Sequence, residues 1–409
     1  MLMNNALTTE GRPNEHEQNA GPAGLRVAII SDFLEEQWPS MDLVADMLTE
    51  SLRAQPAEAI VPTQLRPAMR WRLSRTPLMK NQRVVVNADR LLNRFVDYPR
   101  WLAGRTQYFE LFHVVDHSYS QVIHALPRER TVVTCHDLDT FRCLLDPAQE
   151  QRPPWFRAMA RRTLDGFRLA AHVITVSQAT CDQLLSHGLF AAECVSVIPN
   201  GVHPSCSALP NPPADAIAAE LIPDFGSGPW LLSVGNTLPR KRLDVLLRVF
   251  ASVHRELPEL RLLRVGGFTP NQMELIQEFQ LENAVVTLPF LERDVLAAVY
   301  RRGTLLLHTA EAEGFGLPVI EAMACGCPVV ASDLAVLREV GGTAASYCPV
   351  ADVAAWHQTL IPLLEERLQR PGSWKLRRLQ GINWVSRFSW AENARQTAGI
   401  YRKVMENAK

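Results

Sequence analysis

The sequence predicts an α/β protein with two doubly wound domains, each a parallel sheet between layers of helices. Strand-like apolar runs alternate with helical segments over residues 25–203 and again over 230–387, which is the pattern of βαβ units. The 409 residues are enough for two domains with separate cores. A stretch rich in Pro, Ala and Ser, 204–229, is the expected linker. Residues 1–24 lack periodicity and are expected to be a disordered tail.

The composition narrows the class of protein. Hydrophobic residues make up 47% and charged residues 21% of the chain, as in soluble globular proteins. A formal net charge of −1 argues against a chain that binds polyanions as a whole. The eight cysteines contain no C-x-x-C pair, so we expect reduced thiols and a cytoplasmic location. No apolar run is long enough to span a bilayer, and the first residues do not resemble a signal sequence.

The first domain opens with a buried strand. LRVAIISDF, from Leu25, is a continuous apolar run, and the helical pattern of 41–55 follows it. No G-x-G-x-x-G separates the two, so a dinucleotide site is not expected here. Two further strands end near Asp116 and at Cys135. Because the carboxyl ends of parallel strands share one edge of a sheet, the residues that follow them should face one cleft.

A basic stretch covers residues 66–105. It holds ten Lys or Arg residues against Asp89 and Asp97, with Trp71 and Trp101 among them. Basic and aromatic residues together suit an anionic membrane surface at the inner face of the membrane, or a lipid-linked acceptor that carries phosphate. The alternative is a solvated helix face. No nucleic-acid recognition motif accompanies the stretch, so nucleic acid is not an expected partner.

The second domain places two cations at the start of a helix. The strand 230–234 leads through a loop to Arg240 and Lys241, after which a helix begins. The helix dipole disfavours cations at this end, so their position makes sense if an anion binds between them and the helix. The alternative is two solvated surface cations. Later, Thr269 is expected to cap a helix, and Ser389 with Glu392 spells a capping box for the last helix.

The most informative stretch is 305–330, LLLHTAEAEGFGLPVIEAMACGCPVV. It is predicted as strand, glycine-containing loop, helix with Pro318 in its first turn, and strand. Glu313 lies in the loop and Glu321 one turn into the helix. Backbone N–H groups near Phe315, Gly316 and Leu317 would be free to bind a phosphate. Two carboxylates around an anion site suit a nucleotide sugar; an ordinary helix start is the alternative.

EGFGLPVIEAMACGCPVVAS resembles the Glu-x7-Glu signature of glycosyltransferase family 4, which comprises retaining enzymes of the GT-B fold. The resemblance implies two Rossmann-like domains facing a central cleft, with the C-terminal helix 388–409 crossing back to the first domain. It further implies that Glu313 lies beside the transferred sugar and that Glu321 hydrogen-bonds the nucleotide ribose. The loop from Gly235 to Lys241 resembles the family's G-x-x-x-x-x-K loop. Lys241 would therefore contact the diphosphate, with Arg240 as a second contact.

The first domain carries looser matches. His136, at the end of its strand, resembles the family histidine that approaches the donor sugar or its phosphate; a structural histidine bound to a backbone carbonyl is the alternative. His117 is a weaker candidate. Ser177 and the Asn200–Gly201 pair resemble segments that line the cleft. Relatives carry a glycine pair in the first loop, whereas this chain has Glu35–Met41, so no role is transferred to it.

These observations predict a hexosyltransferase that uses a nucleoside diphosphate sugar. The acceptor would be a glycan, a lipid-linked sugar or a small molecule, and neither a metal nor a cofactor is expected. Asp137-Leu138-Asp139 spells a metal motif of the other glycosyltransferase fold, but three residues are a weak signal. The alternatives are a non-catalytic subunit that binds a nucleotide sugar and another enzyme of the same fold, such as an epimerase. Donor base, sugar, acceptor and oligomeric state cannot be inferred.

Overall fold

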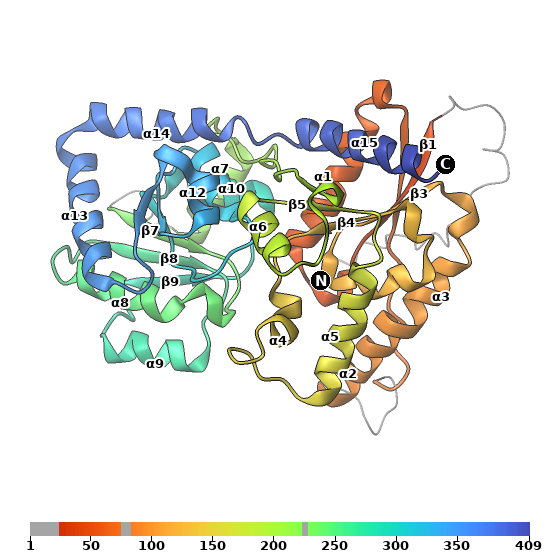
Figure 1. The fold of residues 1–409 in the computed structure, drawn as a ribbon. Coiled ribbons are helices and arrows are strands. Elements are labelled where there is room, and N and C mark those ends of the chain that lie inside the picture. The colour runs from red at the N-terminus through yellow and green to blue at the C-terminus, as the bar shows by residue number, and fades with distance from the viewer. Residues whose placement is uncertain (1–23, 75–82, 223–227) are drawn as a thin grey trace.

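The protein has two lobes, each built on a six-stranded parallel sheet (Figure 1). The structure is a computed structural model and describes residues 24–74, 83–222 and 228–409. The predicted α/β class with two doubly wound domains is confirmed. The predicted tail 1–24 lies, except for Gly24, outside the described residues.

The first lobe has the strand order β2-β1-β3-β4-β5-β6. Its strands are β1 (Leu25–Ile30), β2 (Ile60–Leu65), β3 (Leu111–Val114), β4 (Thr131–Cys135), β5 (His172–Thr175) and β6 (Val195–Val197). Its helices are α1 (Pro39–Arg53), α2 (Arg83–Leu92), α3 (Tyr98–Ala103), α4 (Arg142–Leu145), α5 (Pro154–Phe167) and α6 (Gln178–Ser186). Strands β3, β4 and β5 are wholly buried, which explains their unbroken apolar sequence.

The second lobe has the order β12-β11-β10-β7-β8-β9. Its strands are β7 (Trp230–Val234), β8 (Arg261–Val265), β9 (Val285–Leu288), β10 (Leu305–His308), β11 (Val329–Ser332) and β12 (Ser346–Cys348). Its helices are α8 (Leu243–His254), α9 (Pro270–Glu278), α10 (Arg293–Arg302), α11 (Leu317–Ala324), α12 (Ala335–Gly341), α13 (Val353–Gln369) and α14 (Pro371–Val385). In both sheets the order reverses beside the first strand, so loops of neighbouring strands diverge there and leave room for a ligand.

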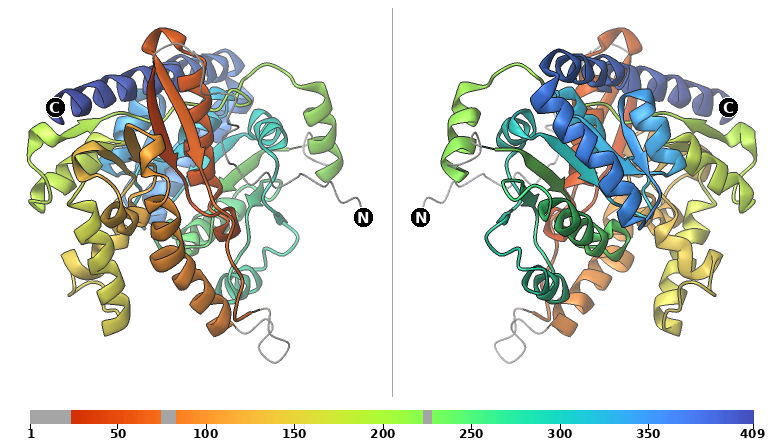
Figure 2. Two further views of the ribbon diagram at one scale, coloured as in Figure 1. Left: turned by 90° about the vertical axis from the view of Figure 1, so that its right-hand side faces the viewer. Right: turned by 90° about the vertical axis from the view of Figure 1, so that its left-hand side faces the viewer.

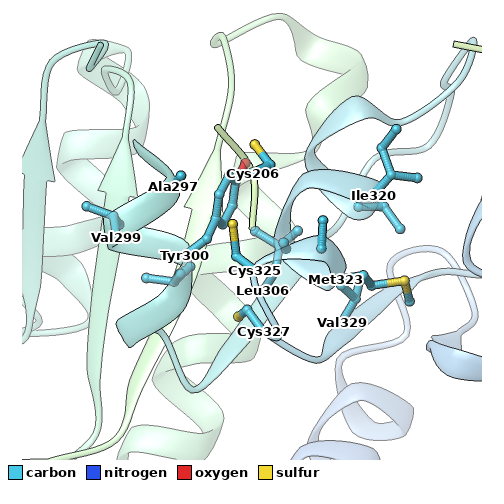
Figure 3. Packing of buried hydrophobic residues seen from close by; sticks show 14 of the residues in the cluster. Cys206, Ala297, Val299, Tyr300, Leu306, Ile320, Met323, Cys325, Cys327 and Val329 are labelled. Atoms are coloured by element: carbon cyan, nitrogen blue, oxygen red, sulfur yellow. The ribbon is translucent and has the colours of Figure 1, made fainter. Parts of the chain in front are cut away.

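The core of the second lobe surrounds helix α11. Figure 3 shows Ile320 and Met323 of this helix with Cys325, Cys327, Leu306 and Tyr300 from the surrounding elements. All of the helix from Val319 to Ala324 is buried. Apart from Glu321, the helix is apolar on every side and therefore lies inside the protein, so its first turn is held firmly at the edge of the sheet. Figure 3 also shows the side chains of Cys206 and Cys325 near Tyr300; all eight cysteines are free thiols.

The expected linker 204–229 contains a helix that the sequence analysis missed. Helix α7 (Pro212–Leu221) begins at Asn211, whose side chain accepts from the N–H of Ala214. The helix packs on the second lobe, and Asp215 accepts a hydrogen bond of 2.7 Å from Arg301. The content of Pro, Ala and Ser was interpreted as that of a linker, but Pro212 and Pro213 lie in the first turn of the helix, where a missing N–H has no cost. The segment is therefore partly a structured element of the second lobe.

The last helix, α15 (Trp390–Asn407), returns to the first lobe. In Figure 1, α14 and α15 run in blue along the top of the molecule, α13 lies at its left edge, and α15 passes over β1 and β3; Figure 2 shows the same blue helices from the two sides. The hydroxyl of Tyr401 lies 2.6 Å from Nδ1 of His113 on β3. Ser389 caps the helix as predicted, but the carboxylate of Glu392 binds Arg395 instead of completing the capping box. At α9, the predicted cap Thr269 forms a full box.

Several cations of the basic stretch 66–105 are paired or directed inward, so the stretch exposes less positive charge than its sequence suggests. Its residues 75–82, with two of the ten cations, lie outside the described part. Arg72 pairs with Asp97, and Arg94 is directed inward to the carbonyl of Ser118. Arg105 stacks on the ring of Trp101. Several of the charges thus serve packing within the lobe. Over the residues that the structure describes, no helix is both long and apolar enough to cross a bilayer.

Candidate active site

The candidate site lies where two loops of the second lobe are joined, one after β7 and one after β10. The N–H of Glu311 donates to the carbonyl of Arg240 over 2.8 Å, and the hydroxyl of Thr309 donates to the carbonyl of Lys241 over 3.1 Å. Residues that are about seventy positions apart in sequence are therefore held by their main chains. The side chains of Lys241 and Glu313 extend from this junction.

Lys241 and Glu313 form an ion pair of 2.5 Å. The carboxylate also lies 3.3 Å from Nε2 of His308 and 3.9 Å from Arg240. Burial raises the pKa of Glu313, but Lys241, His308 and Arg240 outweigh it and hold the pKa well below its usual range. Burial lowers the pKa of His308. The site therefore contains an ionised carboxylate, an ammonium group and a neutral histidine.

Arg240 connects the two lobes. Its guanidinium donates to the carbonyl of Ala312 over 3.2 Å and lies 3.1 Å from Asp139 and 3.7 Å from Asp137 of the first lobe. In the segment Asp137-Leu138-Asp139, both aspartates thus pair with Arg240 across the two lobes. Among the described residues, no group of three or more His, Cys, Asp or Glu side chains is placed to hold a metal ion.

The first turn of α11 has the backbone geometry expected for an anion site. Gly316 has φ +96°, in the left-handed region that favours glycine, and it turns the chain into Leu317 and Pro318. The predicted donor contact at Phe315 involves its backbone N–H and not its side chain. That side chain is buried edge-on against Phe388 at 5.8 Å between ring centroids, because it fills the core behind the loop. Only the backbone of Phe315 remains available to a ligand.

Glu321 lies in a polar environment separate from that of Glu313. The hydroxyl of Tyr300 donates to its Oε2 over 3.1 Å. Burial raises the pKa of Glu321, and the Tyr300 hydrogen bond opposes this. No described residue donates to its Oε1, which leaves one oxygen for a ligand hydroxyl. Tyr300 is a candidate positioning residue that the sequence analysis missed; its only signal was a tyrosine on an apolar helix face.

Gly235 follows β7 and has φ +137°. Its carbonyl accepts a hydrogen bond of 2.6 Å from the buried guanidinium of Arg264, which also donates to Asn236 over 2.8 Å. Burial lowers the pKa of Arg264 to about 10. This arginine, also missed, fixes the start of the loop that carries Lys241. Its signal was a second arginine, flanked by apolar residues, near the end of the strand RLLRV.

His136 lies in the first lobe and faces the loop of Glu313. Its Nε2 donates to the carbonyl of Val115 over 2.8 Å, and burial lowers its pKa. The ring is thus bound to a backbone carbonyl, as in the structural alternative, and no described residue bonds its Nδ1. A Cβ at Gly314 would lie 2.0 Å from the carbonyl oxygen of His136. Ser177 donates to the carbonyl of Gly314 over 2.9 Å, so the lobes touch at this glycine.

Gly201, another predicted cleft residue, packs where the chain returns to the first lobe. Gly201 lies against Trp390, where a Cβ would be 2.3 Å from the backbone nitrogen. In the first loop, Leu34–Glu36 forms a 3₁₀ turn. Glu35 accepts from the N–H of Met69 over 2.9 Å, and Glu36 pairs with Arg94 at 3.4 Å. The unusual loop is therefore bound to its own lobe.

A cavity of about 390 Å³ lies between the lobes. The loop after β4 and helix α6 line it from the first lobe. From the second lobe it is lined by Arg240, by Glu311 to Glu313 and by the start of α12. Gly235, Gly316 and Glu321 do not line it, so this space is distinct from the start of α11.

Comparisons with known proteins identify the family of this chain. A family model described as Glycosyl transferases group 1 matches residues 223–378, and one described as Glycosyltransferase Family 4 matches 47–205. The O-antigen chain mannosyltransferase B of Escherichia coli is 24% identical over 79% of this chain and 81% of its own. A D-inositol 3-phosphate glycosyltransferase of Segniliparus rotundus is 33% identical over 42% of this chain and 39% of its own.

Among solved structures, Anabaena HepE in complex with UDP and glucose has a TM-score of 0.68. It is 16% identical, and the match covers 93% of this chain and 100% of HepE. At this identity the likeness shows the fold alone. Two family models that each match part of one lobe, a relative matched over 81% of its length and a shared fold lead to one assignment. The chain belongs to glycosyltransferase family 4 and is a glycosyltransferase enzyme of the GT-B fold.

Proposed function

We propose that the protein transfers a hexose from a nucleoside diphosphate sugar to an acceptor hydroxyl with retention at the anomeric carbon. The observation that carries the proposal is the 2.5 Å pair of Lys241 and Glu313, in the same loop junction that leads into the first turn of α11. An ammonium, a guanidinium and free backbone N–H groups around one position suit a diphosphate. The ionised Glu313 suits sugar hydroxyls.

The main requirement of the reaction is to stabilise the negative charge that develops on the leaving diphosphate. The bond between the anomeric carbon and the diphosphate oxygen breaks, and the acceptor oxygen forms a bond to the same face of that carbon. The departing diphosphate oxygen accepts the acceptor's proton. Arg240, Lys241 and the start of α11 stabilise the negative charge that develops on the diphosphate, without a metal ion. Glu313 orients the sugar hydroxyls and supports positive charge on the ring.

Donor binding would change the partner of Arg240. This side chain now pairs with Asp139 at 3.1 Å, and a diphosphate would compete for it. Glu321 would use its free oxygen for the ribose. His136, with Nε2 bound to Val115, would offer only Nδ1 to the sugar. A peripheral membrane contact through 66–105 remains a prediction; the paired cations weaken its electrostatic basis.

A panel of UDP-, GDP- and ADP-sugars in thermal-shift assays would identify the donor, since a ligand of the native state raises apparent stability. Incubating that donor with and without acceptors then separates transfer from epimerisation and hydrolysis. Donor turnover should be lost in Glu313→Ala and Lys241→Ala and kept in Lys375→Ala, an exposed lysine on α14. Normal turnover in the first two variants would contradict the assignment.

A further inference from the structure

The start of helix α6 in the first lobe is completed by a carboxylate from the second lobe. The first N–H groups of an α-helix have no partner within the helix. The N–H of Gln178 donates to both oxygens of Glu339 on α12, over 2.8 and 2.9 Å, and the N–H of Ala179 donates to Oε2 over 3.3 Å. The helix's own cap, Ser177, accepts only the next N–H, that of Thr180, over 3.1 Å. Two donors of α6 therefore depend on contact between the lobes.

The contact between Glu339 and α6 is strengthened by charge. A carboxylate at the start of a helix faces the positive end of the helix dipole, and an ionised acceptor forms a stronger hydrogen bond than a neutral one. Figure 1 shows α6 and α12 next to each other where the two lobes meet. If the lobes separated, the carboxylate and both N–H groups would have only water as a partner. The contact therefore favours the arrangement in which the lobes touch.

The same turn of α6 also contacts the loop that carries Glu313. The hydroxyl of Ser177 donates to the carbonyl of Gly314 over 2.9 Å. The hydroxyl of Thr180 lies 3.4 Å from the carbonyl oxygen of His136. The second lobe thus holds one helix start of the first lobe at two points, from α12 and from the loop after β10. The position of α6 determines how the loop of Glu313 meets the first lobe.

We infer that Glu339 is a positioning residue of the transferase, which holds the two lobes together through the start of α6 and keeps the loop of Glu313 against the first lobe during turnover. Glu339 does not line the cavity between the lobes, so it acts on the arrangement of the lobes. The kinetic effect of Glu339 rests on the proposed use of a nucleotide sugar, whereas its effect on lobe separation needs no donor.

Small-angle scattering of the protein without substrate tests the structural part. Glu339→Gln keeps the size of the side chain and one neutral acceptor oxygen, whereas Glu339→Ala removes every acceptor. The radius of gyration should rise from wild type to Glu339→Gln and further to Glu339→Ala. High salt should enlarge the wild type more than Glu339→Ala, because salt screens a partly exposed charge. Glu365→Ala, at an exposed position of α13, is the matched control and should equal the wild type. Circular dichroism checks that all variants fold alike.

Steady-state kinetics with the identified donor tests the part in turnover. Glu339→Ala should lower kcat about tenfold and leave the donor KM within about twofold, because the residues proposed to hold the donor all lie on the second lobe. Glu339→Gln should lie between the wild type and Glu339→Ala. High salt should lower kcat of the wild type more than that of Glu339→Ala. A side chain that only stabilised its own lobe would not give this combination of effects.

Gln178→Pro removes the main donor of the contact from the other lobe. Proline suits the first position of a helix, and Ser177 before it has φ −151° and ψ 156°, the extended backbone that precedes a proline. The helix should therefore persist without the N–H that binds Glu339. Gln178→Pro should lower kcat several-fold in the wild type and have little further effect in Glu339→Ala, because both changes remove the same interaction.

Three results would overturn the positioning role of Glu339: a radius of gyration and kcat in Glu339→Ala equal to those of the wild type, a loss confined to the donor KM, or additive losses in the double variant. If the wild type turns over no nucleotide sugar, the proposed function itself fails. Scattering still decides in that case whether Glu339 holds the lobes together, so the two failures are distinguishable.

Discussion

Nζ of Lys241 lies 2.5 Å from Oε2 of Glu313, and the two side chains are 13% and 10% exposed. Removing Lys241 leaves the buried charge of Glu313 with only the more distant Arg240 as a cationic neighbour. Lys241→Met should therefore lower the free energy of unfolding by about 3 kcal/mol. In Lys241→Met/Glu313→Gln the loss should be smaller than the sum of the single variants, with a coupling of about 1 kcal/mol or more. Denaturant titration of the four proteins measures this, and additive losses would contradict a direct pair.

The low pKa of Glu313 in the folded protein determines how the stability contributed by this ion pair depends on pH. Because the pKa of Glu313 is lower in the folded state than unfolded, its contribution to stability is complete above the unfolded value. That contribution is lost as the pH falls through the folded value. Wild type and Glu313→Gln should therefore differ in unfolding free energy by a constant amount from pH 6 to 8. Their difference should shrink only in acid.

Tyr300 and Glu321 provide a test of positioning on the donor side. Tyr300→Phe removes the 3.1 Å hydrogen bond to the carboxylate, which the tyrosine helps to keep ionised. The KM for the donor should rise about tenfold with kcat little changed, since one oriented hydrogen bond to a charged group is lost. The donor KM of the variant should also rise further as the pH falls, because its Glu321 protonates more readily.

Tyr347→Phe is the matched control. Its hydroxyl donates to the carbonyls of Leu337 and Gly342 in the same lobe but away from Glu321. It should lose similar stability without the change in donor KM. Equal KM effects in the two variants would mean that general loosening of the lobe, and not the orientation of Glu321, causes the change.

Local sequence signals predicted much of the fold and part of the site. The buried strand before His308, the glycine at 316 and Pro318 are local, so the shape of the loop and the start of α11 followed from composition and turn chemistry. Helix α7 was missed because the Pro-, Ala- and Ser-rich segment 204–229 was interpreted as a linker. Such a helix owes its place to packing on the second lobe, which a sequence does not display.

Contacts between distant segments were beyond such reasoning. The pairing of Arg240 with Asp139, the hydrogen bond from Tyr300 to Glu321 and the burial of Phe315 against Phe388 depend on how elements meet in space. The sequence predicts that Arg240 and Lys241 lie near an anion site, but it carries no signal for the carboxylates that pair with Arg240. An arginine, tyrosine or phenylalanine is common in any sequence, so the residues around it in the chain do not indicate which distant residue it will contact.

Gly314 tests whether contact between the lobes is needed for turnover. A Cβ there would lie 2.0 Å from the carbonyl oxygen of His136, and a backbone atom cannot move aside cheaply. Gly314→Ala should hold the lobes apart and reduce kcat/KM by about a hundredfold, because misplaced groups lose orientation. Small-angle scattering should show a larger radius of gyration.

Gly399→Ala serves as the control for Gly314. This glycine lies in α15, where an added Cβ meets nothing within 4 Å. The substitution should keep activity and add up to about 1 kcal/mol of stability, as expected for alanine in a helix. Full activity of Gly314→Ala would show that the lobes need not approach so closely during the reaction.

His113 contacts α15, and its low pKa should make the stability of the protein depend on pH. Its ring nitrogens lie 2.6 Å from the Tyr401 hydroxyl and 2.8 Å from that of Thr134, and burial lowers its pKa to about 3. Between about pH 6.5 and 3 the unfolded chain binds a proton that the folded chain does not, so stability falls as the pH falls. Each pH unit in this window should cost up to about 1.4 kcal/mol from this residue. His113→Gln should have the shallower dependence, by one proton, in unfolding titrations from pH 7 to 5. His124→Gln, at an exposed position, should follow the wild type, and equal slopes for all three proteins would place the acid sensitivity elsewhere.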